Sequence, residues 1–554
     1  GTGGGFYNSA LNGISNSILV NCILWNNDAG VAGPIISENL GSTTFITYSI
    51  IQNGALDAGT DITSPTNKPQ GTDPLFFAAP AASEAPTTDG NFHLLFISPA
   101  IDMGTFAGSP SYDLDGNPRP VNDSVDIGAY ESRYFDCDSF PTNTIYVDSS
   151  AIGLNNGTSW ANAYTNLQFA LMAKRLCDQI DTIKVAMGTY YPSAIDTIYE
   201  LDPCTQLVVD TFIFPFDRTI SFNIPDSVTV LGGYEGILGD TLAVRDWVCN
   251  KTILCGDIDR NGDSVNNSFH VVVTRNVSDQ TIVDGFCISG GNATENSGLG
   301  GGWYNDGSNG GISNPVIRNS IIQMNSAYYG GGLFNDGTDG HASPTIINSI
   351  IRGNHATSDG GGMYNDGEQF NAVFTPQSNP VLINTLITGN KADISGGGIY
   401  NEALSGEAGP IFINSVIAGN YSASAGAVFT HASMVPTIFW NTIIWNNGSA
   451  DNSIIDGTGA GYNASYSIIQ PDAFAAVNNL VGNKTSDPLF LYSPPASSAP
   501  TMAGNFHVLA NSLAIDMGTI AMSPPDDLDG NVRPYHDSID IGAYEFRGPD
   551  CISF

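Results

Sequence analysis

The sequence predicts an all-β fold: a right-handed parallel β-helix, or solenoid, built in tandem units with a short capping helix. Three observations predict it. A glycine triplet followed three residues later by asparagine recurs at 300–305, 330–335, 360–365 and 396–401. A β-branched run ending in Gly-Asn or Met-Asn follows each triplet. A longer repeat places the same closing motifs in two parts of the chain.

The spacing of the triplets defines the size of one coil. They begin at residues 300, 330, 360 and 396, so the steps are 30, 30 and 36 residues. Each step holds two or three short β-branched runs and no helical period. A unit of this size cannot bury its own apolar face, so consecutive units must stack. Stacking on parallel strands gives a β-helix in which each unit makes one coil.

Stacked coils place equivalent residues in columns about 4.8 Å apart. We expect Ile and Val columns to fill the interior. We also expect three columns of asparagine, because stacked amides hydrogen-bond to one another and asparagine tolerates the left-handed backbone of a corner. The members of these columns are Asn319, Asn348, Asn384 and Asn414; Asn325, Asn354, Asn390 and Asn420; and Asn305, Asn335, Asn365 and Asn401.

The glycine triplets do not have the form of a phosphate-binding loop. Such a loop needs GxxxxGK[ST] between a strand and a helix. No lysine and no helical pattern follows the triplets. Glycine instead permits tight corners and close stacking of coils.

The longer repeat divides the chain. DLDGNPRP begins at 113 and DLDGNVRP at 527, and 527 − 113 = 414; GNFH, AIDMGT and DIGAYE recur at the same offset. Residues 1–140 are therefore expected to be the C-terminal part of one β-helix unit and residues 141–554 a complete unit. Within the complete unit, we expect capping elements and first coils at 141–290, the glycine coils at 291–450 and a closing region at 451–554. Since GGGFYN stands at 3–8, we expect the first strand to need an upstream neighbour, from the same protein or another subunit.

The front of the complete unit predicts the capping helix. Residues 166–177 form the one convincing amphipathic segment, with Leu167, Ala170, Leu171 and Leu176 on its apolar face. An open solenoid end exposes strand edges that invite pairing with other chains. We therefore assign this helix to covering the first coil.

Composition restricts the partners. The formal net charge is −37, from 54 acidic and 17 basic residues among 554. A polyanion repels nucleic acid and anionic membranes, so neither is an expected direct partner. No apolar run is long enough to insert into a membrane. None of the eight cysteines forms a CxxC pair, which argues against a zinc ribbon, while disulfides remain compatible with export.

Acidic turns are the candidate metal sites, with calcium as the expected structural ion. The loop from residue 257 has the first half of an EF-hand pattern, with oxygen ligands at alternate positions and then glycine, although Ser268 stands where Glu is expected. The DLDGN turns repeat a shorter acidic pattern. Asp–Gly and Asn turns also occur without metal, and a salt bridge from these aspartates to Arg119 or Arg533 is the alternative. The candidate ligands are Asp257, Asp259, Asn261 and Asp263; Asp113, Asp115 and Asn117; and Asp527, Asp529 and Asn531.

Several motifs resemble known exported proteins. IYVD…NNGTSWANAYTNLQFAL, IKVAMGTYYP and SVTVLGGY resemble bacterial surface proteins of the right-handed β-helix, pectate-lyase-like superfamily. AIDMG…DLDGNxRP…DIGAYE is similar to the choice-of-anchor Q domain, found on many proteins of Bacteroidetes-type bacteria. The GGGxYN coils resemble the polymorphic outer-membrane protein repeats of autotransported adhesins. These resemblances imply an architecture rather than an activity.

The resemblance to lyases implies a calcium-binding acidic cluster with an Arg or Lys base, and hydrolases of this fold would show Gly-His-Gly and Arg-x-Lys segments. Neither segment is present. His93 and His507 occupy equivalent positions and are expected to be packed. Aromatic residues could stack on sugars, although packing at corners is the favoured role; they are Tyr328, Tyr329, Trp440, Trp445 and Trp25. We assign no catalytic residue and expect that the protein is not an enzyme.

The sequence therefore predicts a structural extracellular protein, a tandem β-helix segment of a bacterial surface fibre, stalk or adhesin. The expected partner is the protein itself, through end-to-end association or continuing units, with surface glycans as further candidates. The alternative is a secreted protein that binds or cleaves polysaccharide.

Overall fold

The computed structural model divides the chain into two compact units, Gly1–Pro141 and Thr142–Phe554, called unit 1 and unit 2 below. It describes residues 5–548 except 11–12, 29–35, 39–40, 53–59, 62–66, 69, 80–81, 86–90, 95–97, 117, 121–123, 133–136, 138–139, 141, 193–197, 202–207, 213–216, 240–244, 296–297 and 372–374.

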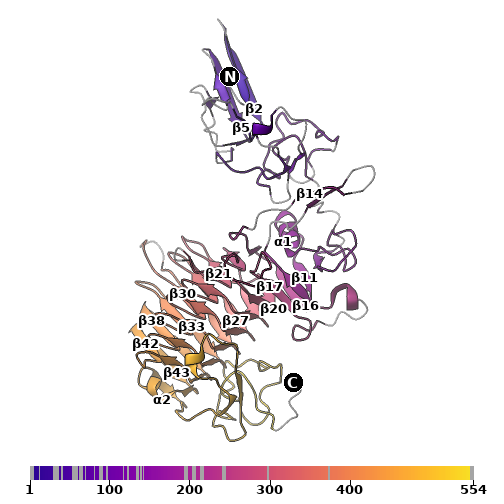
Figure 1. The fold of residues 1–554 in the computed structure, drawn as a ribbon. Helices are drawn as coiled ribbons and strands as arrows, with labels where there is room; N and C mark the ends of the chain where they lie inside the picture. The colour runs from indigo at the N-terminus through magenta and orange to yellow at the C-terminus, as the bar shows by residue number, and fades with distance from the viewer. Residues whose placement is uncertain are drawn as a thin grey trace. The chain divides into compact units, whose positions relative to one another are not determined.

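Unit 2 is a stack of coils whose strands form four long parallel sheets (Figure 1). The eleven-stranded sheet contains β10 (Thr144–Val147), β11 (Thr182–Ala186), β16 (Thr229–Tyr234), β19 (Ile282–Asp284), β23 (Val316–Arg318), β27 (Thr345–Ile347), β31 (Val381–Ile383), β35 (Ile411–Ile413), β39 (Thr437–Trp440), β43 (Tyr462–Ser465) and β45 (Asn478–Val481). The nine-stranded sheet contains β12 (Gly188–Tyr190), β17 (Thr252–Cys255), β20 (Phe286–Ser289), β24 (Ile321–Gln323), β28 (Ile350–Arg352), β32 (Leu386–Thr388), β36 (Val416–Ala418), β40 (Ile443–Trp445) and β44 (Ile468–Ile469).

Two further sheets complete the coils. The eight-stranded sheet contains β15 (Phe222–Ile224), β18 (Val272–Arg275), β22 (Trp303–Asp306), β26 (Leu333–Asp336), β30 (Met363–Asp366), β34 (Ile399–Glu402), β38 (Val428–Ser433) and β42 (Ile455–Gly459). The six-stranded sheet contains β21 (Asn292–Ala293), β25 (Ser326–Ala327), β29 (His355–Ala356), β33 (Lys391–Ala392), β37 (Tyr421–Ser422) and β41 (Gly448–Ser449). Strands of successive coils pair in parallel, so the predicted parallel β-helix is confirmed.

The strand register places one apolar residue from each coil directly above its counterpart. In the nine-stranded sheet, Ile322 pairs with Ile351 and Ile351 pairs with Ile387. All three side chains are fully buried. Because the central residue of each three-residue strand points inward, a short repeated motif builds a continuous apolar core.

The glycine triplets turn the chain between coils. Gly360 has φ +72°, a left-handed conformation that favours glycine. A Cβ at Gly361 would lie 2.3 Å from the carbonyl oxygen of Lys391 and 2.5 Å from that of Gly397. The triplets therefore serve the corner and the close approach of coils.

Helix α1 (Leu167–Leu176) packs against β10 and β15, the first strands of two sheets. The side chain of Asn166 caps it by accepting from the backbone N–H of Gln168. Leu167, Ala170 and Leu171 are buried as expected, whereas Leu176 is only partly buried. The placement agrees with a helix that covers the first coil.

The remaining elements of unit 2 are short. They are the antiparallel pair β13 (Ile198–Leu201) and β14 (Val208–Phe212), the antiparallel pair β46 (Phe490–Tyr492) and β47 (Asn505–Val508), α2 (Pro471–Phe474), and the 3-10 turns η3 (Gly236–Gly239) and η4 (Ala496–Ser498).

Unit 1 also contains parallel strand pairs. Its parallel pairs are β1 (Phe6–Asn8) with β4 (Ile36–Glu38), β2 (Ser15–Val20) with β5 (Ser42–Thr47), β5 with β7 (Thr60–Asp61), and β3 (Ile23–Leu24) with β6 (Ile50–Ile51). An antiparallel pair, β8 (Phe76–Ala78) with β9 (Asn91–Leu94), and the turn η1 (Ala82–Glu84) follow.

Among the described cysteines, Cys137 and Cys177 are each part of a disulfide. The free ones are Cys22, Cys249, Cys255 and Cys287. In the part of the chain that the structure describes, no helix is long and apolar enough to cross a membrane.

Candidate functional site

The asparagines that follow the glycine triplets form a hydrogen-bonded column inside unit 2. Each amide nitrogen donates to the amide oxygen of the next coil, at 3.1 Å for Asn305–Asn335, 2.8 Å for Asn335–Asn365 and 2.8 Å for Asn365–Asn401. All four are fully buried. Hydroxyls end the column: Thr274 donates to Asn305, and Asn401 donates to Thr430. Because a neutral amide is both donor and acceptor, stacking satisfies its polar atoms without charge.

A second buried column runs through Asn325, Asn354, Asn390 and Asn420. In each step, the backbone N–H and the amide nitrogen both donate to the amide oxygen of the next coil, at 3.0–3.1 Å. Each amide also donates to a main-chain carbonyl, as Asn354 does to Ile322. The column continues through Asn447 to Gln470, two members that sequence reasoning missed. This column joins main chain and side chain of successive coils.

The third predicted set does not form a continuous amide column. Asn319, Asn348, Asn384 and Asn414 all have positive φ, between 48° and 50°, so their common role is the left-handed corner. Asn384 donates to Asn348 at 2.9 Å, but Asn319 donates to Asp284. Asn384 also donates to the carbonyl of Asp526, far along the chain. These residues therefore share a corner conformation of the backbone, while their side chains bind different partners, some of them in the closing region.

A hydroxyl column was missed in the sequence. The backbone N–H of Ser320 donates to the Ser349 hydroxyl, and Thr385 and Thr442 make the same contact with Ser415 and Ser467. The signal was the Ser or Thr that follows each corner asparagine of the coils. Its regular position would have indicated this column.

The outer surface of the eight-stranded sheet carries a carboxylate column. Asp306, Asp336, Asp366 and Glu402 are paired in register on consecutive strands. At the ends of the column, Arg275 pairs with Asp306 at 2.7 Å, and His431 Nδ1 lies 2.6 Å from Glu402 Oε1. Rings stack beside it, from Phe334 to Tyr364 at 4.8 Å, Tyr364 to Tyr400 at 4.8 Å and Tyr400 to Phe429 at 5.1 Å.

Burial and like charge act together on the middle of this column. Burial is the main cause that raises the pKa of Asp366 to about 7, and the neighbouring carboxylates of Asp336, Glu368 and Glu402 add to it. Burial also raises the pKa of Asp336. The Tyr304 hydroxyl donates to Asp336 at 2.8 Å. The column is therefore a place where the charge of unit 2 depends on pH near neutrality.

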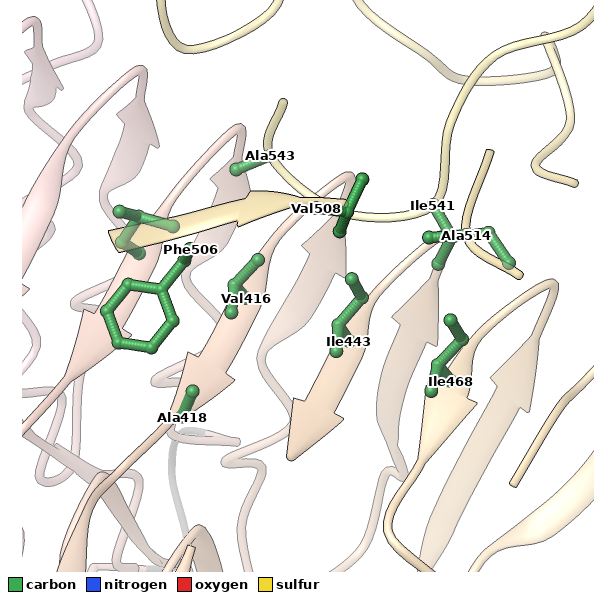
Figure 2. Close-up of a cluster of buried hydrophobic side chains, with 10 residues drawn as sticks. Val416, Ala418, Ile443, Ile468, Phe506, Val508, Ala514, Ile541 and Ala543 are labelled. Carbon is green, nitrogen blue, oxygen red and sulfur yellow. The ribbon is translucent and has the colours of Figure 1, made fainter. Parts of the chain in front are cut away.

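The closing region of unit 2, residues 487–546, packs on the outer face of the nine-stranded sheet and is called the closing module. Phe506 and Val508 of β47 lie over strands that carry Val416 and Ile443 (Figure 2). Ala514, Ile541 and Ala543 complete the contact with Ile468 and Leu386. Outward apolar residues of the coils are thus buried by a later segment of the chain.

The closing module of unit 2 and its counterpart in unit 1, residues 73–132, hold the same polar pairs. His93 Nε2 lies 2.6 Å from Asp115 Oδ2, and His507 Nε2 lies 2.7 Å from Asp529 Oδ2. The rings stack on equivalent tyrosines: His93 on Tyr130 at 4.0 Å and His507 on Tyr544 at 3.8 Å. These histidines are partly exposed and fixed in place by a carboxylate and a ring.

The arginine partners differ from the expected ones. Arg119 Nε lies 3.5 Å from Glu131, and Arg533 Nε lies 3.8 Å from Glu545, with both pairs buried. The expected salt bridge to the DLDGN aspartates is therefore wrong in its partner, because the glutamate of DIGAYE fills that place. Burial raises the pKa of Asp540 to about 7, and its equivalent Asp126 behaves alike.

The DLDGN turns bind their own backbone. Asp527 Oδ1 accepts from the N–H groups of Asp529 and Asn531, and Oδ2 accepts from the amide of Asn531 and the N–H of Glu545. In unit 1, Asp113 accepts in the same way from Asp115 and Glu131. Asn117 lies outside the described residues. A cation needs carboxylate oxygens that are free to bind it, whereas the oxygens of Asp113 and Asp527 already accept hydrogen bonds. These contacts argue against a metal site at the DLDGN turns.

The 257 loop is also closed by its own hydrogen bonds. Asp257 accepts from Asn261 and Gly262, and Asp263 accepts from Val265. Asp259 Oδ2 accepts from two amides, while Asp259 Oδ1 is buried without a hydrogen-bond partner. Ser268 is buried and donates to the carbonyl of Ile220, so it faces the core.

No group of three or more His, Cys, Asp or Glu side chains that could hold a metal occurs among the described residues. The unpartnered oxygen of Asp259 is the feature that fits a cation in the 257 loop. Calcium there stays a prediction.

The aromatic side chains considered for sugar stacking are engaged in packing. Tyr328 and Tyr329 contact each other edge to face, with ring centres 4.7 Å apart. The Trp440 indole donates to the carbonyl of Ala521. Trp445 packs against the closing module of unit 2, and Trp25 packs in the corresponding cluster of unit 1.

Comparisons with known proteins add little to this geometry. No protein-family model matches the chain, and no curated protein matches it. A crystal structure of pectate lyase Pel9A is similar, at 14% identity and a TM-score of 0.36, over 74% of this chain and 98% of that chain. The assignment of the fold rests on the strand pairing. The family resemblances of the motifs stay predictions.

Proposed function

We propose that this chain is a structural segment of an extracellular bacterial surface protein, in which tandem β-helix units form a fibre, stalk or adhesin shaft. The observation that carries the proposal is the closing module, which occurs in both units with the same His–Asp and Arg–Glu pairs. Repetition of a whole unit adds length, whereas a catalytic site rarely needs to be copied in series.

The last described coil supports association end to end. β45 is the final strand of the eleven-stranded sheet, and Leu480 and Val481 on it are 59% and 49% exposed. β42 likewise ends the eight-stranded sheet. Unpaired edges of this kind recruit another chain, and we expect a second copy or a continuing unit to cover them.

Electron microscopy of the native protein tests the proposal. We expect end-to-end filaments, shortened by Leu480→Lys because a charge on an edge strand opposes pairing. Ile520→Lys is the matched control, since Ile520 is also 59% exposed but lies in the closing module. Monodisperse single rods from the native protein would overturn the proposal.

Calcium is the proposed structural ion of this assembly, in the 257 loop. We expect calcium to raise the melting temperature of the full chain, and Asp259→Asn to abolish the rise because it removes the negative charge of the group that carries the unpartnered Oδ1. Asp527→Asn should leave the calcium response unchanged, because the Asp527 oxygens already accept four N–H groups. An unchanged melting temperature after chelation would remove calcium from the account.

Glycan cleavage is the rival function. The carboxylate column supplies neighbouring acids on Asp336 and Asp366, with the pKa of Asp366 raised to about 7, and paired carboxylates are what glycosidases use. Incubation with neutral and uronic-acid polysaccharides should release neither reducing ends nor unsaturated products. Product release that Asp366→Asn abolishes would establish the rival.

A further inference from the structure

A cavity of about 200 Å³ opens where the closing module meets the nine-stranded sheet of unit 2. Arg352 and Thr388 line it from consecutive strands of the sheet. Asn505, His507 and Tyr544 line it from the closing module. The cavity thus lies between two parts of one compact unit and combines polar groups from both.

Arg352 is not paired with an acid. Its Nε donates to the side-chain oxygen of Gln323 at 3.0 Å. Within the described residues, no carboxylate lies within 4.0 Å of it and its two terminal nitrogens have no hydrogen-bond partner. Other arginines of the coils do pair, as Arg318 does with Asp284 at 2.6 Å. With 54 acidic residues against 17 basic ones, an arginine on a cavity wall without an acid is left for an external anion.

The closing module fixes further groups around this cation. His507 Nδ1 lies 2.7 Å from Asn505 Oδ1, and its Nε2 lies 2.7 Å from Asp529 Oδ2. The backbone N–H of His507 also donates to Asn505 Oδ1, which identifies that atom as the amide oxygen. The amide nitrogen of Asn505 therefore remains a donor, with no partner in the described part of the chain.

We propose that this cavity binds a small organic carboxylate, held by an ion pair with the Arg352 guanidinium and a hydrogen bond from the Asn505 amide. A guanidinium presents parallel N–H donors that match the two oxygens of a carboxylate. The cavity volume is sufficient for a carboxylate with a group no larger than about a monosaccharide. The site does not depend on the proposed role as a fibre.

Isothermal titration of the full chain tests the site with sodium acetate, sodium glucuronate and uncharged glucose at low ionic strength. We expect both carboxylates to bind and glucose not to bind. Tighter binding of glucuronate identifies a sugar acid as the source of the carboxylate, and equal binding identifies any small carboxylate. Equal heats for glucuronate and glucose would overturn the proposal.

Arginine variants locate the binding. Arg352→Gln should weaken glucuronate binding at least tenfold, because the ion pair is lost while a polar side chain remains beside Gln323. Arg260→Gln, at an exposed arginine that stacks on Tyr191, is the control and should bind as the native protein does. Equal affinity of Arg352→Gln and native protein would contradict the assignment.

Chemical modification tests the same site without a variant. Phenylglyoxal reacts with accessible arginines, and mass spectrometry reports each position. Glucuronate should slow modification of Arg352 severalfold and leave Arg260 unchanged, whereas glucose should protect neither. Equal modification of Arg352 with and without glucuronate would refute the site.

Discussion

Asn365 and Asp366 are adjacent on β30, yet they build opposite kinds of column. Asn365 points inward, is fully buried and hydrogen-bonds to Asn335 and Asn401. Asp366 points outward, and its register partners are the carboxylates of Asp336 and Glu402. The in-register stacking from coil to coil is the same at both positions, whereas the face of the sheet and the chemistry of the side chain differ.

The difference shows what a β-helix does to each side chain. Parallel in-register pairing places copies of one residue on top of each other, about 4.8 Å apart. An amide both donates and accepts, so stacking it stabilises the fold, whereas an ionised carboxylate only accepts and repels its copies. In a solenoid, repetition therefore adds up the stabilisation from stacked amides and the repulsion between stacked carboxylates.

Exchanging the two chemistries should have the largest effect. Asn365→Asp places a carboxylate in a fully buried position where one oxygen must face the acceptor oxygen of Asn401. We expect the free energy of unfolding at pH 8 to fall by about 3–5 kcal/mol, the cost of an uncompensated buried charge. Urea unfolding followed by circular dichroism measures it.

Acid is the internal control for this variant. Burial should raise the pKa of the new carboxyl above its unfolded value, so the loss should shrink as pH falls and the group becomes a hydrogen-bond donor. A loss at pH 4 as large as that at pH 8 would show that shape, rather than charge, explains the interior column.

Removing an amide should have the next largest effect. Asn354→Ala leaves the backbone N–H of Asn325 without its acceptor. The Asn325 amide keeps only the Ile288 carbonyl, and the Asn390 amide oxygen keeps only the backbone N–H of residue 354. Buried donors left unpaired cost about 1–3 kcal/mol each, so unit 2 should lose about 2–4 kcal/mol of stability by urea unfolding. Asn478→Ala on the exposed strand β45 is the control and should change stability by less than about 0.5 kcal/mol. Near-equal values for the two variants would mean that the columns contribute little.

The stacking of equivalent residues could be predicted because each sequence repeat forms one coil of the β-helix. Each triplet fixes where Asn305, Asn335, Asn365 and Asn401 stand, so their stacking follows from spacing. The corner set was harder, because the corner asparagines share a backbone conformation rather than a side-chain contact. Their partners, such as the carbonyl of Asp526 for Asn384, come from another part of the chain.

The closing module shows the limit of sequence reasoning. Its motifs recur at a fixed offset, which reveals that they belong together but not which groups pair. Arginine could have bound either the aspartates of DLDGN or the glutamate of DIGAYE, and the fold selects Glu131 and Glu545. The cavity at Arg352 was invisible for the same reason, since Arg352 and Asn505 are far apart in sequence and meet only through packing.

Neutralising the outward column should have the smallest effect and the opposite sign. The folded pKa of Asp366, about 7, lies above the value near 3.8 of an unperturbed aspartate. Folding therefore binds a proton more tightly, and this contribution to stability is complete below about pH 4 and is lost as pH rises through 7. Asp366→Asn keeps the oxygen that accepts from Glu368 and removes the charge facing Asp336 and Glu402. We expect the variant to be more stable than the native protein at pH 8, on the order of 1 kcal/mol, and equal to it at pH 4.

Asp306→Asn is the control, because Asp306 is paired with Arg275 and should lose rather than gain stability at pH 8. The carboxyls of Asp126 and Asp540 titrate in the same range but are common to all the proteins compared, so they cancel in the differences. A less stable Asp366→Asn at pH 8 would mean that the outward carboxylates bind something that compensates their charge, and the contrast with the interior column would then fail.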